Sequence, residues 1–192
     1  MADLDKTIFL WLNSFVGTVP AFDALIEVVV SDYLAPVVLA LVLLALWIGG
    51  ESTVREKYQM GVFAAVLAVA LSNASIEILN GFYFRDRPFV DHEVSLLFYE
   101  PTDSSFPANS AALAFAISTV VWVINRRLGT PLLVLSGLYA FSRVYAGGHY
   151  PLDVIGGGLI GVLATPIAYG VVRLLRPLIV MVLKAGRIVL LA

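Results

Sequence analysis

The side chains best suited to chemistry stand close together between Ser142 and Asp153. Arg143, His149 and Asp153 suit reactions of phosphate esters, because a guanidinium binds the anion, a neutral imidazole can attack phosphorus, and a carboxylate can orient the imidazole. Asp153 follows His149 at a spacing of four residues, so its carboxylate can reach back to the ring. Alternatively, Asp153 only stabilises the start of the helix that Pro151 begins.

Two arginines in a second segment favour the binding of an anion. Arg85 and Arg87 stand in an Arg-x-Arg-Pro pattern that ends at Pro88. Guanidinium groups match phosphate oxygens in shape and charge, and proline stiffens the turn that presents them. A simpler interpretation is that both arginines only anchor a helix end near the lipid headgroups. Asn80 lies earlier in the same segment and adds a hydrogen-bond donor.

A third polar segment, which contains Ser105, Pro107, Asn109 and Ser110, opens a long apolar run. Ser105 suits the N-cap of a helix and Pro107 its first turn, so an ordinary helix start explains much of the pattern. The free amides and the positive dipole end of such a helix also attract anions. The segment therefore fits both a helix start and a phosphate-binding turn.

The composition of the chain indicates a membrane protein. Of its 192 residues, 60% are hydrophobic and 14% are charged, and the mean hydropathy is +0.92. A single soluble core of this size cannot bury so much apolar surface. The lack of cysteine excludes disulfides and thiolate metal sites, and two histidines leave little material for a zinc site. We expect contact with the lipid bilayer, and no metal, cofactor or nucleic-acid partner.

Long apolar runs predict an all-α, polytopic membrane bundle within residues 34–175, because each run approaches or reaches the ~20 residues that cross a bilayer. The expected five spans are Leu34–Gly50, Tyr58–Leu79, Ala108–Ile124, Leu128–Ala146 and Leu152–Leu175. Residues 1–31 contain apolar pieces too short to cross, so we expect an N-terminal interfacial segment. Residues 176–192 are predicted to form a cytoplasmic interfacial tail. The whole chain, 1–192, is predicted to be a single domain.

The basic residues predict which side of the membrane holds the polar segments. Alternating the five spans collects eight of the twelve basic residues on one side, which the positive-inside rule assigns to the cytoplasm. These are Arg55, Lys57, Arg126, Arg127, Arg173, Arg176, Lys184 and Arg187. The segments around Arg87, Ser110 and His149 then face the extracytoplasmic side of a multi-pass plasma-membrane protein.

Together the three segments resemble the motifs of the type 2 phosphatidic acid phosphatase (PAP2) superfamily, which read Lys-x6-Arg-Pro, Pro-Ser-Gly-His and Ser-Arg-x5-His-x3-Asp. The resemblance covers about residues 73–161, and its third motif matches in full at Ser142, Arg143, His149 and Asp153. The first motif keeps Arg87 and Pro88 but has Asn80 in place of lysine. The second keeps Pro107, while Ala108, Asn109 and Ser110 replace serine, glycine and histidine.

This resemblance implies a PAP2-like helical fold and a metal-independent phosphatase that works through a phosphorylated histidine. Carried over by position, the catalytic residues are His149, the nucleophile, and Asp153, its orienting group. The phosphate-binding residues by the same argument are Arg87, Arg143, Asn80, Arg85, Ser110 and Asn109. The implied partner is a lipid phosphate or diphosphate.

The positions at which this sequence differs from the family motifs affect which substrate we expect. In the family the second-motif histidine protonates the leaving group, whereas the hydroxyl of Ser110 is a poor proton source at roughly pH 7. A diphosphate releases a phosphomonoester whose second pKa is about 6, which is a good leaving group without a proton. The resemblance therefore favours a polyprenyl diphosphate, such as the undecaprenyl lipid carrier of cell-wall sugars, which small bacterial-type members recycle. His92 is an alternative proton donor, although a solvated loop histidine is the simpler interpretation.

A second class of function stays open at this point. The alternative to the enzyme is a degenerate family member that binds or carries a lipid phosphate with the retained arginines and does not hydrolyse it. A transporter of free anions fits less well, because no basic residue lies in the middle of a predicted span. The sequence leaves open the lipid headgroup and the oligomeric state.

Overall fold

Every regular element of the chain is a helix in the computed structural model, which describes residues 2–49 and 52–190 and the side chains of residues 3–49 and 54–184. The helices are α1 (Ala2–Asn13), α2 (Pro20–Val30), α3 (Leu34–Ile48), α4 (Ser52–Asn80), α5 (Pro88–Asp91), α6 (Asn109–Ile124), α7 (Arg126–Tyr145), α8 (Pro151–Leu174) and α9 (Arg176–Leu190). The prediction of an all-α fold is confirmed for these residues. Gly50 at the end of the first predicted span, the side chain of Arg187 and the tail residues 191–192 lie outside the described part.

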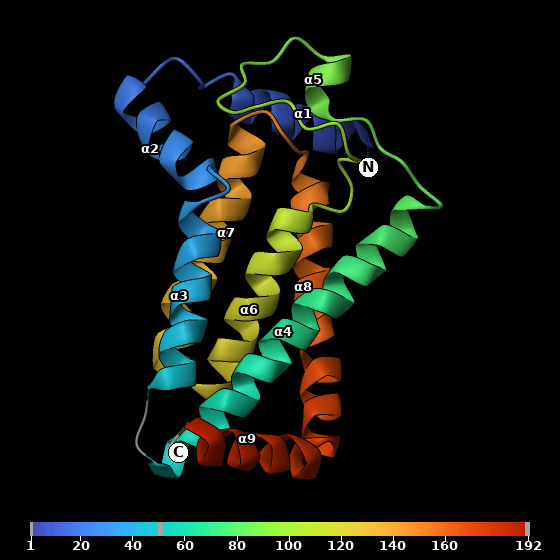
Figure 1. Cartoon of the computed structure of the whole chain (residues 1–192). Helices are drawn as coiled ribbons and strands as arrows, with labels where there is room; N and C mark the ends of the chain where they lie inside the picture. The colour runs from blue at the N-terminus through green and yellow to red at the C-terminus, as the bar shows by residue number, and fades with distance from the viewer. Residues whose placement is uncertain (1, 50–51, 191–192) are drawn as a thin grey trace.

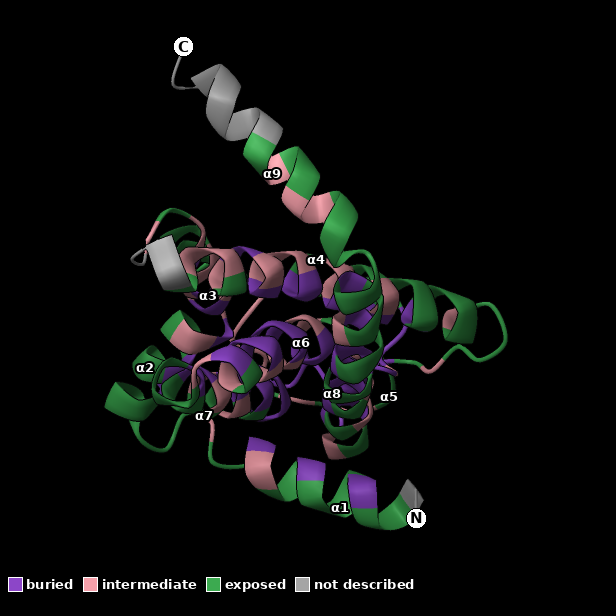
Figure 2. Ribbon diagram, turned by 90° about the horizontal axis from the view of Figure 1, so that it is seen from below, coloured by how far each residue is buried: buried purple, intermediate pink, exposed green. Residues whose placement is uncertain are grey.

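Helix α6 is the centre of the bundle. In Figure 2, which looks along the bundle, α6 lies between α3, α4, α7 and α8 and is coloured mostly as buried. Its sequence explains this position, because Ala111, Ala112, Ala114, Ala116 and Ser118 are small and buried and let neighbouring helices approach closely. Helix α1 lies at one end of the bundle beside α7 and α8, and α9 projects sideways away from the bundle at the other end (Figure 1 and Figure 2).

The apolar helices are those of a membrane protein. Val54–Asn80 of α4 and the whole of α8 are long and apolar enough to cross a bilayer. Helices α2 and α3, which are bent by 47° at a short break, together qualify as a third span, and α6 is apolar but shorter. A membrane helical bundle is therefore confirmed, whereas five spans stay a prediction. Helix α2, which was predicted to be part of the N-terminal interfacial segment, continues into α3 through this bend.

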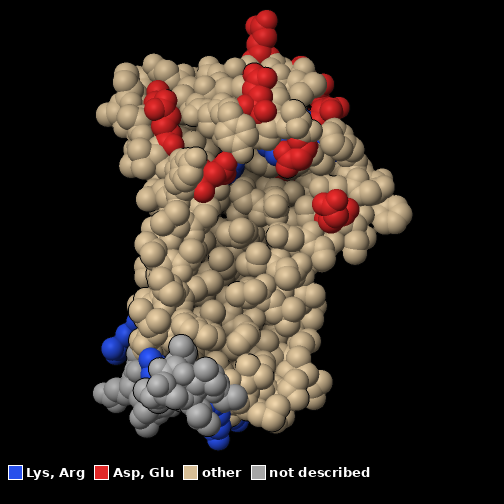
Figure 3. All heavy atoms as spheres, in the orientation of Figure 1, with Lys and Arg blue, Asp and Glu red and all other residues tan. Residues whose placement is uncertain are grey.

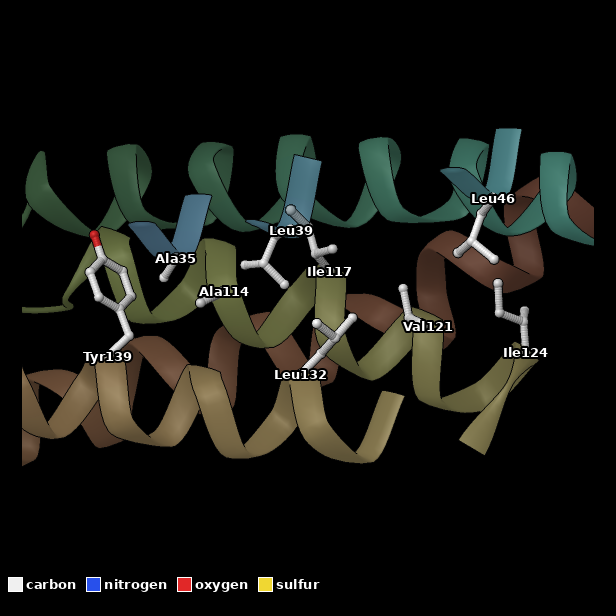
Figure 4. Close-up of a cluster of buried hydrophobic side chains, with 9 residues drawn as sticks. All are labelled: Ala35, Leu39, Leu46, Ala114, Ile117, Val121, Ile124, Leu132 and Tyr139. Atoms are coloured by element: carbon white, nitrogen blue, oxygen red, sulfur yellow. The ribbon is translucent and has the colours of Figure 1, made fainter. Parts of the chain in front are cut away.

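One core cluster joins α3, α6 and α7 (Figure 4). Leu39 on α3, Ile117 on α6 and Leu132 on α7 point toward one another among smaller buried residues of the same cluster. Inside a membrane such packing stabilises the bundle mainly through van der Waals contact. Tyr139 of α7 stands at one end of the cluster, where its hydroxyl reaches the polar site described below.

The close approach of α8 to α6 depends on two glycines. A Cβ atom at Gly157 would lie 2.1 Å from the carbonyl oxygen of Ala108, and one at Gly161 would lie 2.3 Å from that of Ala112. No larger residue fits these positions without separating the helices. Because α8 begins directly after His149 and α6 directly after the Ser105 segment, this contact holds two of the three motif segments together.

Replacing Gly161 by alanine should lower thermal stability. The added carbon would also lie 2.8 Å from the amide nitrogen of Ala116, and overpacking of this kind costs about 1–3 kcal/mol. The matched control is Gly170→Ala on the same helix, where no atom lies within 4 Å and alanine favours the helix by roughly 1 kcal/mol. Thermal unfolding in detergent should show a lower Tm for Gly161→Ala and an equal or higher Tm for Gly170→Ala. Equal changes in both variants would contradict close packing at Gly161.

Candidate active site

The polar segments meet in one pocket at the end of the bundle where α1 lies. The pocket has a volume of about 240 Å³. It is lined by Asp32, Pro36, Arg87, Tyr99, Pro101, Asp103, Asn109, Ser110, Leu113, Tyr139, Arg143 and His149. The structure therefore brings together five of the eight predicted site residues. The other three, Asn80, Arg85 and Asp153, do not line this pocket.

His149 is held in one tautomer by its two neighbours. The ring is buried, with Nδ1 2.9 Å from the backbone carbonyl oxygen of Ser105 and Nε2 3.0 Å from Nη1 of Arg87. A carbonyl oxygen only accepts hydrogen bonds and a guanidinium only donates them. Nδ1 of the neutral ring must therefore carry the proton, and Nε2 must present its lone pair beside Arg87.

The surroundings of His149 keep its ring neutral. Burial, and then the positive charges of Arg87 and Arg143, lower the pKa of His149 well below its ordinary value, against a smaller opposing effect of the Ser105 carbonyl. At neutral pH the imidazole is unprotonated. It therefore has the lone pair that a nucleophile requires.

Asp153 supports the histidine indirectly. Its Oδ2 atom is 4.0 Å from Nδ1 of His149, which is beyond hydrogen-bond distance, so the direct contact that the four-residue spacing predicted is not formed. Instead, Asp153 accepts hydrogen bonds from the Ser105 hydroxyl and from the Tyr150 amide, the latter at 2.8 Å as a cap of α8. Asp153 therefore caps the start of α8, as the helix-start interpretation requires, but this is not its only contact. Asp153 is thus linked to His149 through Ser105, whose carbonyl oxygen lies 2.9 Å from Nδ1 of the ring.

Ser105 is not the N-cap that the sequence predicted. Helix α6 begins later, at Asn109, and its N-cap residue is Ala108. The Ser105 backbone amide donates to the carbonyl oxygen of Arg85 at 2.8 Å, which joins the first and second motif segments. Serine is common at helix N-caps, which is why the sequence predicted a cap, but here the Ser105 hydroxyl donates to the buried carboxylate of Asp153.

Arg85 joins α1 to Asp153 through two ion pairs. Its Nη1 donates to Asp153 at 2.6 Å and its Nη2 to Asp5 of α1 at 2.7 Å, while its guanidinium lies 4.1 Å from the centre of the Tyr150 ring. Asp5 is 3% exposed and also accepts a hydrogen bond from the Leu152 amide at 2.9 Å. Both terminal nitrogens of Arg85 therefore already have carboxylate partners within the protein. Asp5 had no motif to single it out, and only its acidic side chain in an apolar helix distinguished it.

Each arginine of the pocket is paired with a more exposed carboxylate. Arg87 donates through Nη2 to Asp103 at 2.8 Å, and Arg143 donates to Asp32. The arginine side chains are 5% and 4% exposed, whereas Asp103 and Asp32 are 66% and 45% exposed. Burial makes the arginine charges strong anion ligands, and exposure makes the two carboxylates replaceable by another anion.

Asp32 has further partners that sequence reasoning did not find. The hydroxyl of Tyr99 donates to Asp32 at 2.8 Å, and Tyr139 lies between Asp32 and Arg143 with hydrogen bonds to both. Asp32 stands in the bend between α2 and α3, and Tyr99 stands in the loop after α5. The only indication in the sequence was an acidic residue at a break between apolar runs.

Ser110 offers an unused polar atom to the pocket. Its Oγ is buried and makes no hydrogen bond within the described residues. Asn109 lines the same wall. Asn80 Oδ1, at the end of α4, also lacks a hydrogen bond, but it lies outside the pocket. The ring of His92 packs edge-on against Tyr150, with ring centres 6.5 Å apart, and it does not line the pocket either.

The charges are separated along the bundle. In the face shown in Figure 3, Asp and Glu gather around the site end and Lys and Arg mark the opposite end. Within the described residues, no group of three or more histidine and acidic side chains is arranged to hold a metal ion. The site is thus a small pocket with two buried cations, a neutral imidazole and two replaceable carboxylates.

Known proteins resemble this chain along most of its length. The PAP2 superfamily matches residues 61–177. The undecaprenyl-diphosphatase BcrC of Bacillus subtilis (strain 168) is 34% identical over 161 residues, which are 83% of this chain and 80% of that protein. The putative undecaprenyl-diphosphatase YbjG of Escherichia coli (strain K12) is 29% identical over 176 residues, which are 88% of this chain and 84% of that protein.

A solved structure agrees with these sequence matches. The crystal structure of Aquifex aeolicus LpxE superposes with a TM-score of 0.67 at 29% identity and covers 84% of this chain and 92% of its own. The family match extends over more than half of the chain and includes the Arg87, Ser110 and His149 segments. The chain therefore belongs to the PAP2 superfamily of membrane phosphatases, the family that its motifs resemble.

Proposed function

We propose that this phosphatase hydrolyses a polyprenyl diphosphate of the undecaprenyl type, through a phosphohistidine on His149. The observation that carries the proposal is the neutral His149 ring, whose Nε2 lone pair lies 3.0 Å from buried Arg87 in a pocket that also contains Arg143. Nucleophile and anion ligands then occupy one site. The similarity to a relative named undecaprenyl-diphosphatase supports the choice of substrate.

Substrate binding is an exchange of anions in this proposal. The terminal phosphate takes the places of Asp32 on Arg143 and of Asp103 on Arg87, because a phosphate dianion offers more charge and more acceptor oxygens than a carboxylate. Nη1 of Arg87 then turns from Nε2 to a phosphate oxygen. This movement frees the lone pair of His149 at the moment when the phosphate arrives.

The chemical steps conserve atoms and electrons without a cofactor. The Nε2 lone pair of His149 forms the bond to the terminal phosphorus, and the bond from phosphorus to the bridging oxygen breaks with its electron pair on the departing polyprenyl phosphate. Water then attacks the phosphorus of the phosphohistidine, the P–N bond breaks with its electron pair returning to Nε2 of His149, and the protons of the water leave with inorganic phosphate. The growing positive charge on the ring is stabilised by the Ser105 carbonyl at Nδ1 and by the Asp153 carboxylate 4.0 Å away.

The missing acid of the second motif selects the leaving group. Ser110 occupies the position of the family histidine and can donate a hydrogen bond but not a proton at neutral pH. A departing phosphomonoester, with its second pKa of about 6, is stable without protonation, whereas an alkoxide is not. A diphosphate therefore suits this pocket better than a phosphate ester of an alcohol.

We further propose that five spans place the site on the extracytoplasmic face of the plasma membrane. The basic residues at the bundle end opposite the pocket support this orientation (Figure 3), since such residues favour the cytoplasmic side. On the outer face the enzyme would regenerate the lipid carrier of cell-wall sugars. Phosphate release from polyprenyl diphosphate, polyprenyl phosphate and phosphatidate by purified protein, with chelator present, tests the function.

Replacing His149 by alanine should abolish turnover and leave substrate binding almost unchanged. The imidazole acts along the reaction coordinate, so kcat should fall by about 10⁴-fold or more, while the arginines keep the Kd for the diphosphate within roughly threefold. Phosphate release and equilibrium binding of the same lipid measure the two effects. His92→Ala is the control and should change neither. If the wild type binds the lipid through Arg87 and Arg143 but releases no phosphate, the carrier alternative holds instead.

Restoring the family residue by Ser110→His should widen the substrate range. A histidine at this position can protonate an alkoxide, so phosphatidate hydrolysis should rise by roughly 10²-fold or more, while diphosphate hydrolysis changes much less. Rates with both lipids give the comparison, and Asn109→His, on the same wall, is the positional control. A uniform rise with both substrates would argue against a missing acid.

Labelling of single cysteines tests the orientation, and the natural chain, which has no cysteine, provides an unlabelled background. A cysteine at Val90, which is 62% exposed in α5, should react with an impermeant maleimide on intact cells. A cysteine at Arg127, exposed at the start of α7, should react only after permeabilisation. The reverse pattern would move the site to the cytoplasm.

A further inference from the structure

A second polar pocket lies at the end of the bundle far from the active site. It is formed by the first turns of α4, the last turns of α8 and the start of α9, and its volume is about 360 Å³. The lining residues are Glu56, Lys57, Met60, Tyr169, Val172, Arg173 and Arg176. None of them belongs to the three motif segments, so the hydrolytic site does not account for this pocket.

The pocket carries an excess of positive charge. Its three cations, Lys57, Arg173 and Arg176, face the single carboxylate of Glu56. Arg176 pairs with Glu56 at 2.9 Å, and Lys57 donates to the carbonyl oxygen of Ile124 at 2.7 Å. Arg173 makes no ion pair or side-chain hydrogen bond within the described residues. An anionic group in this pocket would therefore find an unpaired guanidinium.

Part of the wall of the pocket is apolar. Met60 of α4 and Tyr169 and Val172 of α8 contribute to it, and the first two are partly buried against a core cluster. Both helices are the long apolar ones that qualify as membrane spans. A small free anion would contact only the cations, whereas a lipid would use the cations for its headgroup and the wall for the start of an acyl chain.

Helix α9 marks the level of the lipid headgroups. Leu178, Met181 and Val182 lie on one face of α9 by their spacing, and each is about 60% exposed. Helix α9 projects sideways away from the bundle (Figure 2), and no other part of the described protein covers this apolar face. A helix of this kind lies in the membrane interface with its apolar side in the bilayer. The pocket at its first residue is then at headgroup depth.

We propose that this pocket binds an anionic glycerophospholipid. The lipid phosphate is held by Arg173 and Arg176, and the adjoining acyl chain lies against Met60 and Val172. Basic pockets between transmembrane helices bind anionic headgroups in this way. The site is independent of the hydrolytic reaction, and its occupant joins α4, α8 and α9 at the bundle end opposite the active site.

Titration of the purified full-length protein in neutral detergent tests the proposal. Phosphatidylglycerol should raise the Tm in a saturable manner, because a ligand that binds the folded state stabilises it. Arg173→Gln should increase the half-maximal lipid concentration by about five- to tenfold, since one headgroup contact is lost. Glu56→Gln should decrease that concentration, because it removes the competing carboxylate and frees Arg176.

Matched controls separate this pocket from general charge attraction. Arg127→Gln removes an exposed cation at the same end of the bundle but outside the pocket, and it should leave the half-maximal concentration within about twofold. Phosphatidylcholine with the same acyl chains should give no saturable increase. An Arg173→Gln titration equal to that of the wild type overturns the proposal. Stabilisation by soluble glycerol 3-phosphate as strong as by the lipid overturns the lipid assignment.

Discussion

The buried carboxylate of Asp153 is the constraint on which the geometry of the candidate active site depends. Its side chain is 0% exposed, and a charge without water must be matched by donors from the protein. The donors are Arg85 of the first motif, the hydroxyl of Ser105 and the amide of Tyr150. These donors come from separate segments of the chain, so pairing the Asp153 charge brings the segments together. The carbonyl oxygen of Ser105 is thereby placed beside Nδ1 of His149.

Much of this arrangement was visible in the sequence. Apolar runs of membrane length predicted a helical bundle, and fixed motif spacings pointed to the residues that line one pocket, among them Arg87, Ser110, Arg143 and His149. Such patterns are local in the chain, so they can be recognised without a structure. The chemical roles of these side chains follow from their types and stay proposals.

The rest could not be predicted because it depends on contacts between distant segments and on backbone atoms. The four-residue spacing of His149 and Asp153 suggested direct contact, but that argument requires a helix, and α8 begins only at Pro151. The backbone carbonyl of Ser105 holds the ring instead. Every residue has such a carbonyl, so the sequence does not show which one will contact His149. Asp5 meets Arg85 across 80 positions of the chain, which no local pattern reveals.

In the proposed mechanism, the carboxylates beside the two pocket arginines would also determine how the catalytic cycle ends. Inorganic phosphate between two buried guanidinium groups would dissociate slowly, because its departure would leave two unpaired cations without water. Asp32 and Asp103 remove this penalty, since each can return to its arginine as the product leaves. With both ion pairs formed, the pocket is close to electrically neutral, and in the proposed mechanism the same pairs that the substrate displaces would weaken the binding of the product.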